Sequence, residues 1–108
     1  MKRNLLILSA LSVLFTACNK TETEPTQPCD SGVLVLNSGN FFDNNGSITL
    51  LERNSKNASY DIFQKENLRA ISGGISGYTE VDEKGLILVD NSTDGKDAIE
   101  IVNARTFK

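Results

Sequence analysis

The 108-residue sequence contains no histidine and no tryptophan, and it has only two cysteines and two prolines. Without histidine, the chain lacks the usual general base for a serine or cysteine nucleophile and the commonest ligand of transition metals. The 11 lysines and arginines are scattered from Lys2 to Lys108, so they form no basic patch for a phosphate backbone. The sequence therefore predicts a protein that is not an enzyme, holds no metal or cofactor, and does not bind nucleic acid.

The first 18 residues have the pattern of a lipoprotein signal peptide. The basic pair Lys2-Arg3 precedes an apolar run over residues 5–17, broken only by small hydroxyl residues. This run is shorter than the about 20 apolar residues that a membrane-spanning helix needs. Its end, Phe-Thr-Ala-Cys at 15–18, resembles a lipobox with phenylalanine in place of the usual leucine. The pattern predicts cleavage between Ala17 and Cys18 and lipidation of Cys18.

The residues after Cys18 indicate which bacterial membrane the lipidated chain would be sorted to. Several acyl chains on one cysteine anchor a protein stably, since each buried methylene contributes about 0.8 kcal/mol. Asn19 stands where aspartate would mark inner-membrane retention in some bacteria, and Glu22 and Glu24 resemble surface-export tethers. We therefore expect an outer-membrane lipoprotein, and both the periplasmic and the surface leaflet stay open.

The composition divides the chain into a signal peptide (1–17), a lipidated cysteine with a disordered tether (18–30) and a β domain (31–108). The tether consists of Thr, Glu, Pro, Gln and Lys without apolar periodicity, a composition that buries too little surface to fold. Cys29 is the only cysteine besides Cys18, so lipidation of Cys18 would rule out a disulfide within the chain.

The β domain alternates short apolar runs with clusters of Gly, Asn, Asp and Ser, which indicates an all-β, antiparallel chain. Between the third and fourth strands, residues 64–76 begin with a segment that suits one helical turn, and Asp82–Gly85 predicts a tight turn. The six expected strands are Val33–Asn37, Ser47–Arg53, Ser59–Phe63, Gly77–Asp82, Leu86–Asp90 and Ala98–Asn103.

The strands contain an internal repeat. Gly32–Leu36 matches Gly85–Val89, Ser47–Leu51 matches Ala98–Val102, and a polar loop follows the first strand of each pair. The spacing of about 50 residues favours blades of a β-propeller, with repeated hairpins of a sandwich as the alternative. The chain would supply one to two blades of an incomplete ring, with Val33–Leu36 and the matching strand exposing apolar faces.

The first repeat loop concentrates amide and aromatic side chains, and two interpretations of it are open. Asn and Asp favour turns because they tolerate a left-handed backbone and bond their own main chain. Exposed aromatic rings among amides also suit a loop that faces a ligand. The candidate ligand-facing residues are Asn37, Asn40, Phe41, Phe42, Asp43, Asn44 and Asn45.

Two further motifs imitate known sites. Ala70–Gly74 approximates the serine nucleophile elbow, but the absence of histidine favours a glycine-rich turn. Asp90–Gly95 imitates the first half of a calcium loop. Its twelfth position would be Ile101, with Glu100 one place early, so a solvated loop with at most weak calcium binding is expected.

Four segments together resemble the opening blade of surface-layer-like, YncE-like propeller lipoproteins: Gly32–Phe41, Asn45–Ile48, Leu86–Ser92 and Ile99–Lys108. The resemblance implies a ring of seven blades that binds small ligands or partners on one face. Some members of the family capture cobalamin together with an outer-membrane transporter. Seven blades of about 45 residues need over 300 residues, so this chain would correspond to the first one or two.

Taken together, these patterns predict a lipid-anchored, non-catalytic binding module of the cell envelope, as a fragment of a surface propeller. Its ligand would be cobalamin-like or another small nutrient, and an outer-membrane transporter would be a partner. The alternative is a structural or interaction lipoprotein, or a truncated remnant without function. In either case, open β edges would allow self-association.

Overall fold

The computed structural model describes Cys29 and residues 32–108. The predicted signal peptide, the cleavage site at Ala17 and Cys18, and the tether apart from Cys29 lie outside the described residues. Cys29 packs against the domain core, and its N–H donates a hydrogen bond to the Arg105 carbonyl at 3.3 Å. No helix in the described part is long and apolar enough to cross a membrane.

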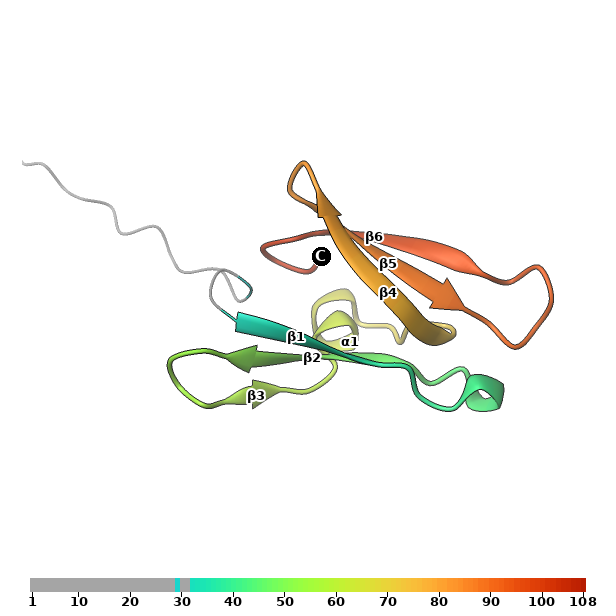
Figure 1. Cartoon of the computed structure of the whole chain (residues 1–108), viewed down its shortest axis with the longest axis horizontal. Coiled ribbons are helices and arrows are strands. Elements are labelled where there is room, and N and C mark those ends of the chain that lie inside the picture. Colours follow the sequence, from blue (N-terminus) through green and yellow to red (C-terminus); the bar gives the residue numbers. More distant parts are fainter. Residues whose placement is uncertain (1–28, 30–31) are drawn as a thin grey trace, which may run out of the picture.

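The domain consists of two three-stranded antiparallel sheets in separate layers, with one short helix between them (Figure 1). The first sheet has the order β1 (Gly32–Asn37), β2 (Ser47–Glu52), β3 (Ala58–Ser59), and the second β4 (Gly74–Val81), β5 (Lys84–Asp90), β6 (Ala98–Asn103). The helix α1 (Ile62–Asn67) joins the sheets, and a 3₁₀ turn η1 (Phe41–Asp43) follows β1. The expected antiparallel β fold is thus confirmed in outline, and the described strands do not close into a ring.

The predicted third strand is wrong beyond its first residue. Pairing with β2 stops at Ser59, and the chain enters α1 at Ile62. Asp61 begins the helix, since its carboxylate accepts a hydrogen bond from the Gln64 N–H at 3.2 Å. Ile62 and Phe63 favour strands by residue type, but both are fully buried between the sheets on the helix. Capping and burial therefore outweigh the local preference.

The second sheet begins earlier than predicted. β4 starts at Gly74 instead of Gly77, and a bulge between Ile75 and Gly77 leaves Ser76 without an opposite residue. The predicted tight turn is confirmed at the other end of the strand. Asp82 and Glu83 form its two central residues, with φ of 48° and 63°, the left-handed backbone of a two-residue hairpin.

The internal repeat is present as two hairpins, β1–β2 and β5–β6, but their registers do not allow both strand matches made from the sequence, and one of the two must shift by one residue. Leu34 lies opposite Leu50, whereas Leu86 lies opposite Ile101. With Leu50 matched to Ile101, the counterpart of Leu34 is therefore Leu86 and not Ile87. A correction of one residue matters, because neighbouring residues in a strand point to opposite faces.

With this register, equivalent residues face in different directions in the two sheets. Leu34, Leu36, Ile48 and Leu50 of the first sheet point toward the second sheet and pack in or against the core. Their counterparts Leu86, Leu88, Ile99 and Ile101 share the opposite face of the second sheet, which points away from the core. With Leu50 matched to Ile101, the two sheets thus stack front to back, as successive copies of one repeat.

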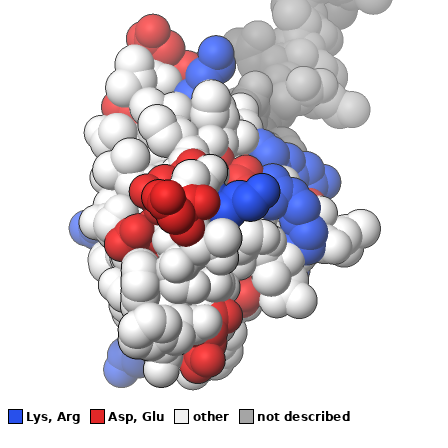
Figure 2. Space-filling model, turned by 90° about the vertical axis from the view of Figure 1, so that its right-hand side faces the viewer, with Lys and Arg blue, Asp and Glu red and all other residues white. Residues whose placement is uncertain are grey.

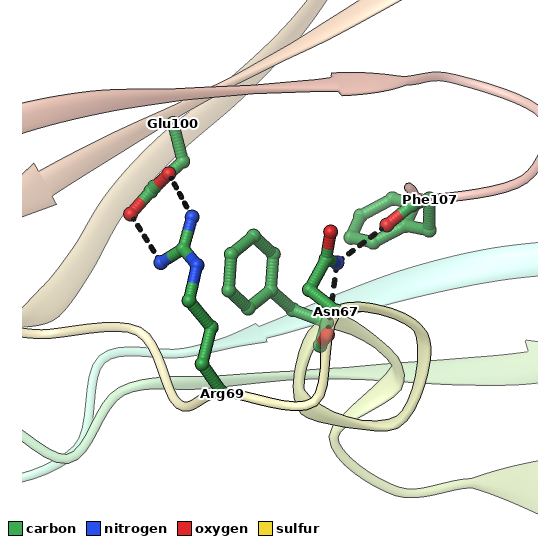
Figure 3. A network of polar contacts seen from close by, with 5 residues as sticks. Asn67, Arg69, Glu100 and Phe107 are labelled. Atoms are coloured by element: carbon green, nitrogen blue, oxygen red, sulfur yellow. Dashed lines mark hydrogen bonds and ion pairs between the residues drawn. The ribbon is translucent and has the colours of Figure 1, made fainter.

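The core lies between the sheets and is closed by the helix. Along one side β1 contacts β4, and α1 packs against β2. The Asn67 amide on α1 donates to the carbonyls of Phe63 and Phe107 at 2.9 and 2.8 Å, which ties the helix to the segment after β6 (Figure 3). The buried core residues are Ile48, Leu50, Ile62, Phe63, Ile71, Ile75, Ile87, Val89, Val102 and Phe107.

Candidate functional site

The candidate ligand loop connects β1 with β2 and lies at the same end of the molecule as the loop between β5 and β6 (Figure 1). A close backbone contact holds it there. The Gly46 N–H donates to the Gly73 carbonyl at 2.9 Å, and Asn45 forms a parallel bridge with Gly73. A Cβ atom on Gly46 would lie 2.7 Å from that carbonyl oxygen, so only glycine allows this approach.

Most of the amide side chains in the loop hold the turn together. The Asn40 Oδ1 accepts a hydrogen bond from the Phe42 N–H at 3.0 Å and begins η1. The Asn45 Oδ1 accepts from the Asn40 N–H at 2.7 Å. Asn37 lies apart on β1, where its amide donates to the hydroxyls of Ser47 and Thr49 at 3.3 and 3.2 Å. The contacts of Asn40 and Asn45 support the turn interpretation, whereas Asn37 joins the side chains of two paired strands.

Asn44 joins this loop to the loop of the second repeat. It ends η1 in a left-handed conformation, with φ of 49°. Its amide donates to the Ser92 hydroxyl at 2.8 Å, and the Ser92 N–H donates back to its Oδ1 at 2.9 Å. The two loops therefore form one rim, although 48 residues separate these side chains in the sequence.

The aromatic pair is the part of the loop that is available to a ligand. Phe41 and Phe42 meet edge to face, with ring centroids 5.4 Å apart, and Phe42 is 82% exposed. Beside Phe41, a shallow hollow of about 200 Å³ also includes Ser38 and Asp90 in its wall. The arrangement offers one aromatic wall, the hydroxyls of Ser38 and Ser76 and one carboxylate, which suits contact with a small molecule better than chemistry on it.

Of the other two motifs, Ala70–Gly74 is an extended connection that leads into β4, and Asp90–Gly95 ends β5 and continues into a loop with a turn. The Ser72 carbonyl accepts from the Asn91 amide at 2.6 Å, and the Asn91 N–H donates to the Asp97 carboxylate at 2.9 Å. The Asn91 Oδ1 accepts from the Thr93 N–H at 2.8 Å. Among residues 29 and 32–108, no three cysteine or acidic side chains gather closely enough to hold a metal ion.

An ion pair that the sequence did not predict joins the segment just after α1 to β6. Arg69 and Glu100 form two hydrogen bonds of 2.8 and 2.7 Å (Figure 3), and the Arg69 guanidinium also covers the Phe63 ring at 4.8 Å. The hydrogen bond from Arg69 lowers the pKa of Glu100, and the same bond raises the pKa of Arg69. Burial, followed by the hydrogen bond to Glu80, raises the pKa of Tyr78.

The apolar outer face of the second sheet is larger than the sequence predicted. The exposed residues of Val33–Leu36 and Leu86–Val89 confirm that these strands have outward apolar faces, at Val33, Val35 and Leu88. Ile99 and Ile101 extend the outer face of the second sheet and are 59% and 63% exposed. The available signal was the alternation of Ile99 and Ile101 on a strand beside Leu86 and Leu88.

The two rim loops carry Asp43, Asp90, Asp94 and Asp97 against the single base Lys96. Figure 2 shows this end of the molecule, where acidic and basic atoms lie side by side and uncharged atoms cover most of the surface.

In the comparisons with known proteins, no family model, no curated protein and no solved structure matches the chain.

Proposed function

We propose that this chain is a lipid-anchored, non-catalytic binding module of the bacterial outer membrane, and that it forms the first blades of a propeller lipoprotein. The front-to-back stacking of two equivalent sheets is the observation that supports this proposal most directly. Lipid on Cys18 would hold the module at the membrane, and the rim formed by the two repeat loops would face the ligand.

The outer faces favour a propeller over a sandwich. In a two-layer sandwich, the outer face of each sheet meets water and carries mainly polar side chains. Here the outer face of the first sheet exposes Val33, Val35 and Leu51, and that of the second exposes Ile99 and Ile101. A sheet that is apolar on both faces suits a place between two neighbouring sheets, as in a propeller.

The proposed ligand is a cobalamin-like or other small nutrient, delivered to an outer-membrane transporter. Support comes from the exposed Phe41–Phe42 pair and the adjacent hollow, together with the sequence resemblance. The second candidate is a structural or interaction lipoprotein, or a truncated remnant without function. The exposed apolar faces favour the interaction role, because such patches mark contact surfaces on soluble domains.

Replacement of Cys18 tests the anchor. The Cys18→Ser chain should lose incorporation of labelled palmitate and leave the membrane fraction, because its oxygen cannot take the thioether-linked lipid. Cys29→Ser is the matched control and should keep both the label and the membrane location. Equal labelling of the wild type and the Cys18→Ser chain would contradict the proposal.

Equilibrium dialysis with cyanocobalamin tests the ligand. We expect the detergent-purified wild-type lipoprotein to bind it, and Phe42→Ala to bind at least about tenfold more weakly at unchanged thermal stability. Leu68→Ala, a change at another exposed apolar residue outside the rim, is the control. Absence of binding by the wild type would remove cobalamin as the ligand and leave the interaction role as the better proposal.

A further inference from the structure

The outer face of the second sheet is an apolar surface formed by β5 and β6. It consists of Leu86, Leu88, Ile99 and Ile101, which the cross-strand register places together on one face of the sheet. Leu86 pairs with Ile101 and Leu88 pairs with Ile99, so the four side chains form one compact block. The block leaves three large aliphatic side chains exposed, Leu88, Ile99 and Ile101.

We propose that this face binds the outer face of the first sheet in a second copy of the chain, so that copies associate head to tail. The outer face of the first sheet is formed by Val33, Val35, Thr49 and Leu51 on β1 and β2. This inference rests on the repeat described above and not on the lipid anchor or a ligand. The sheets that flank this domain would come from other copies of the chain, whereas a further blade of the same chain would occupy the same two faces and leave a monomer. The inference concerns sheet faces, not strand edges.

The contact within one chain identifies the occupant. There, Leu34, Leu36, Ile48 and Leu50 pack onto the inner face of the second sheet, which presents Ile87 and Val102. Leu86, Leu88, Ile99 and Ile101 stand at the equivalent positions of the next repeat. They therefore present the same aliphatic pattern to whatever covers them. The equivalent receiving face belongs to the first sheet, where Val35 and Leu51 occupy the places of Ile87 and Val102.

The receiving face is chemically suited to burial. Among the described residues, the side chains that β1 and β2 direct to it are uncharged. Its polar residues satisfy one another, since the Asn37 amide donates to Thr49 at 3.2 Å and to Ser47 at 3.3 Å. Burying this face thus leaves no bare charge there, and the Asn37 amide nitrogen keeps its partners within the face, which lowers the desolvation cost.

The proposed contact is heterologous, because two different faces meet. In a pair of copies, one copy would keep its first-sheet outer face free and the other its second-sheet outer face. Further copies could therefore add at both ends, which leads to a closed ring or an open stack and not to a two-fold dimer. Pairing two copies of the second sheet would instead set the Ile99–Ile101 block against itself. The contact inside the chain provides no precedent for that arrangement.

Photocrosslinking of the full-length chain in the expressing cells tests this inference. A benzoylphenylalanine placed at Ile99 should give a species of twice the mass, whose crosslinked peptide includes residues of β1 or β2 from the other copy. The same group at Thr93, which is exposed in the adjacent loop, is the control and should give no such species.

A second variant tests the receiving face. Val35→Lys, added to the chain that carries the photoreactive group at Ile99, should lower the dimer yield about tenfold or more, because an ammonium group would be buried in an apolar contact. Val35 is partly exposed, so the monomer should keep its wild-type level and protease resistance. A crosslink only to other proteins, a crosslink between two second sheets, or monomer alone would overturn the proposal.

Discussion

Asn44 and Ser92 form a reciprocal pair between the loops of the two repeats. The Asn44 amide donates to the Ser92 hydroxyl at 2.8 Å, while the Ser92 N–H donates to the Asn44 Oδ1 at 2.9 Å. One side chain thus satisfies two groups of the other loop and ties the two sheets together at the rim. Because Asn44 also has a left-handed backbone, no residue type lacking an amide meets both requirements equally well.

Replacement of Asn44 should therefore weaken the domain. We expect Asn44→Ala to lower the free energy of unfolding by about 1–2 kcal/mol, since it removes both hydrogen bonds and places a Cβ-bearing residue without an amide at φ of 49°. Urea unfolding followed by circular dichroism measures the change. Asn44→Gly removes the hydrogen bonds without the backbone strain, so its free energy of unfolding should lie between those of the wild type and Asn44→Ala. A free energy of unfolding of Asn44→Ala equal to that of the wild type would contradict this account.

Phe107 provides a test of the core near the end of the described chain. It is fully buried, and its ring stacks on Tyr78 with centroids 6.0 Å apart. Phe107→Ala should cost about 3–5 kcal/mol, a large part of the stability of a small domain. Phe42→Ala, at a residue 82% exposed, is the matched control and should change stability by less than about 0.5 kcal/mol. Similar thermal midpoints for both variants would show that Phe107 does not support the core.

Leu68 is a place where substitution should stabilise the protein. It ends α1 with φ of 56° and is 91% exposed. Its backbone is therefore strained, and its side chain gains no burial that would offset the strain. Leu68→Gly should raise the free energy of unfolding by about 0.5–1 kcal/mol, because glycine adopts this conformation without a Cβ clash. Leu68→Ala retains the strain and should behave like the wild type. Thermal unfolding of the three proteins would show the difference, and a lower midpoint for glycine would refute it.

The Arg69–Glu100 pair should make stability depend on pH. Its side chains are 54% and 23% exposed, so Glu100→Gln should cost no more than about 1 kcal/mol at neutral pH. Because the folded protein lowers the pKa of Glu100, this contribution is present above the ordinary glutamate pKa of about 4.3. It is lost as the pH falls through the lowered value. The difference between wild type and variant, measured by urea unfolding at pH 7 and pH 3, should therefore shrink at pH 3.

Several elements could be predicted from local sequence. The strands β1, β2, β5 and β6 each follow an alternating or continuous run of branched residues, and the turn at Asp82–Glu83 follows from its polar residues. For the amide-rich loop, the sequence allowed two interpretations, a turn or a ligand site. Its asparagines bond the backbone and the neighbouring loop, whereas Phe41 and Phe42 stay exposed.

The short helix was predicted only in part. Residues 64–76 were expected to begin with one helical turn, and α1 covers residues 64–67 of that segment, but it already starts at Ile62. Ile62 and Phe63 favour a strand in isolation, and only the gap between the sheets gives them a place to be buried on a helix. The Arg69–Glu100 pair likewise joins residues 31 apart in the sequence, with no local pattern that relates them. Such contacts depend on how the two sheets are placed.

By itself, the sequence determined the antiparallel strands, the repeated hairpins and the turn at Asp82–Glu83, because these follow from residue preferences within a few neighbours. Only the tertiary structure decided which face of each strand is buried. A register shift of one residue exchanges the two faces of a strand. The sequence match made Ile87 the repeat equivalent of Leu34, whereas the observed pairing, with Leu50 matched to Ile101, makes Leu86 its equivalent. In the second sheet, the cross-strand register places Ile99 and Ile101 beside Leu88 and Leu86 on the outward face, which the residue preferences of one strand do not specify.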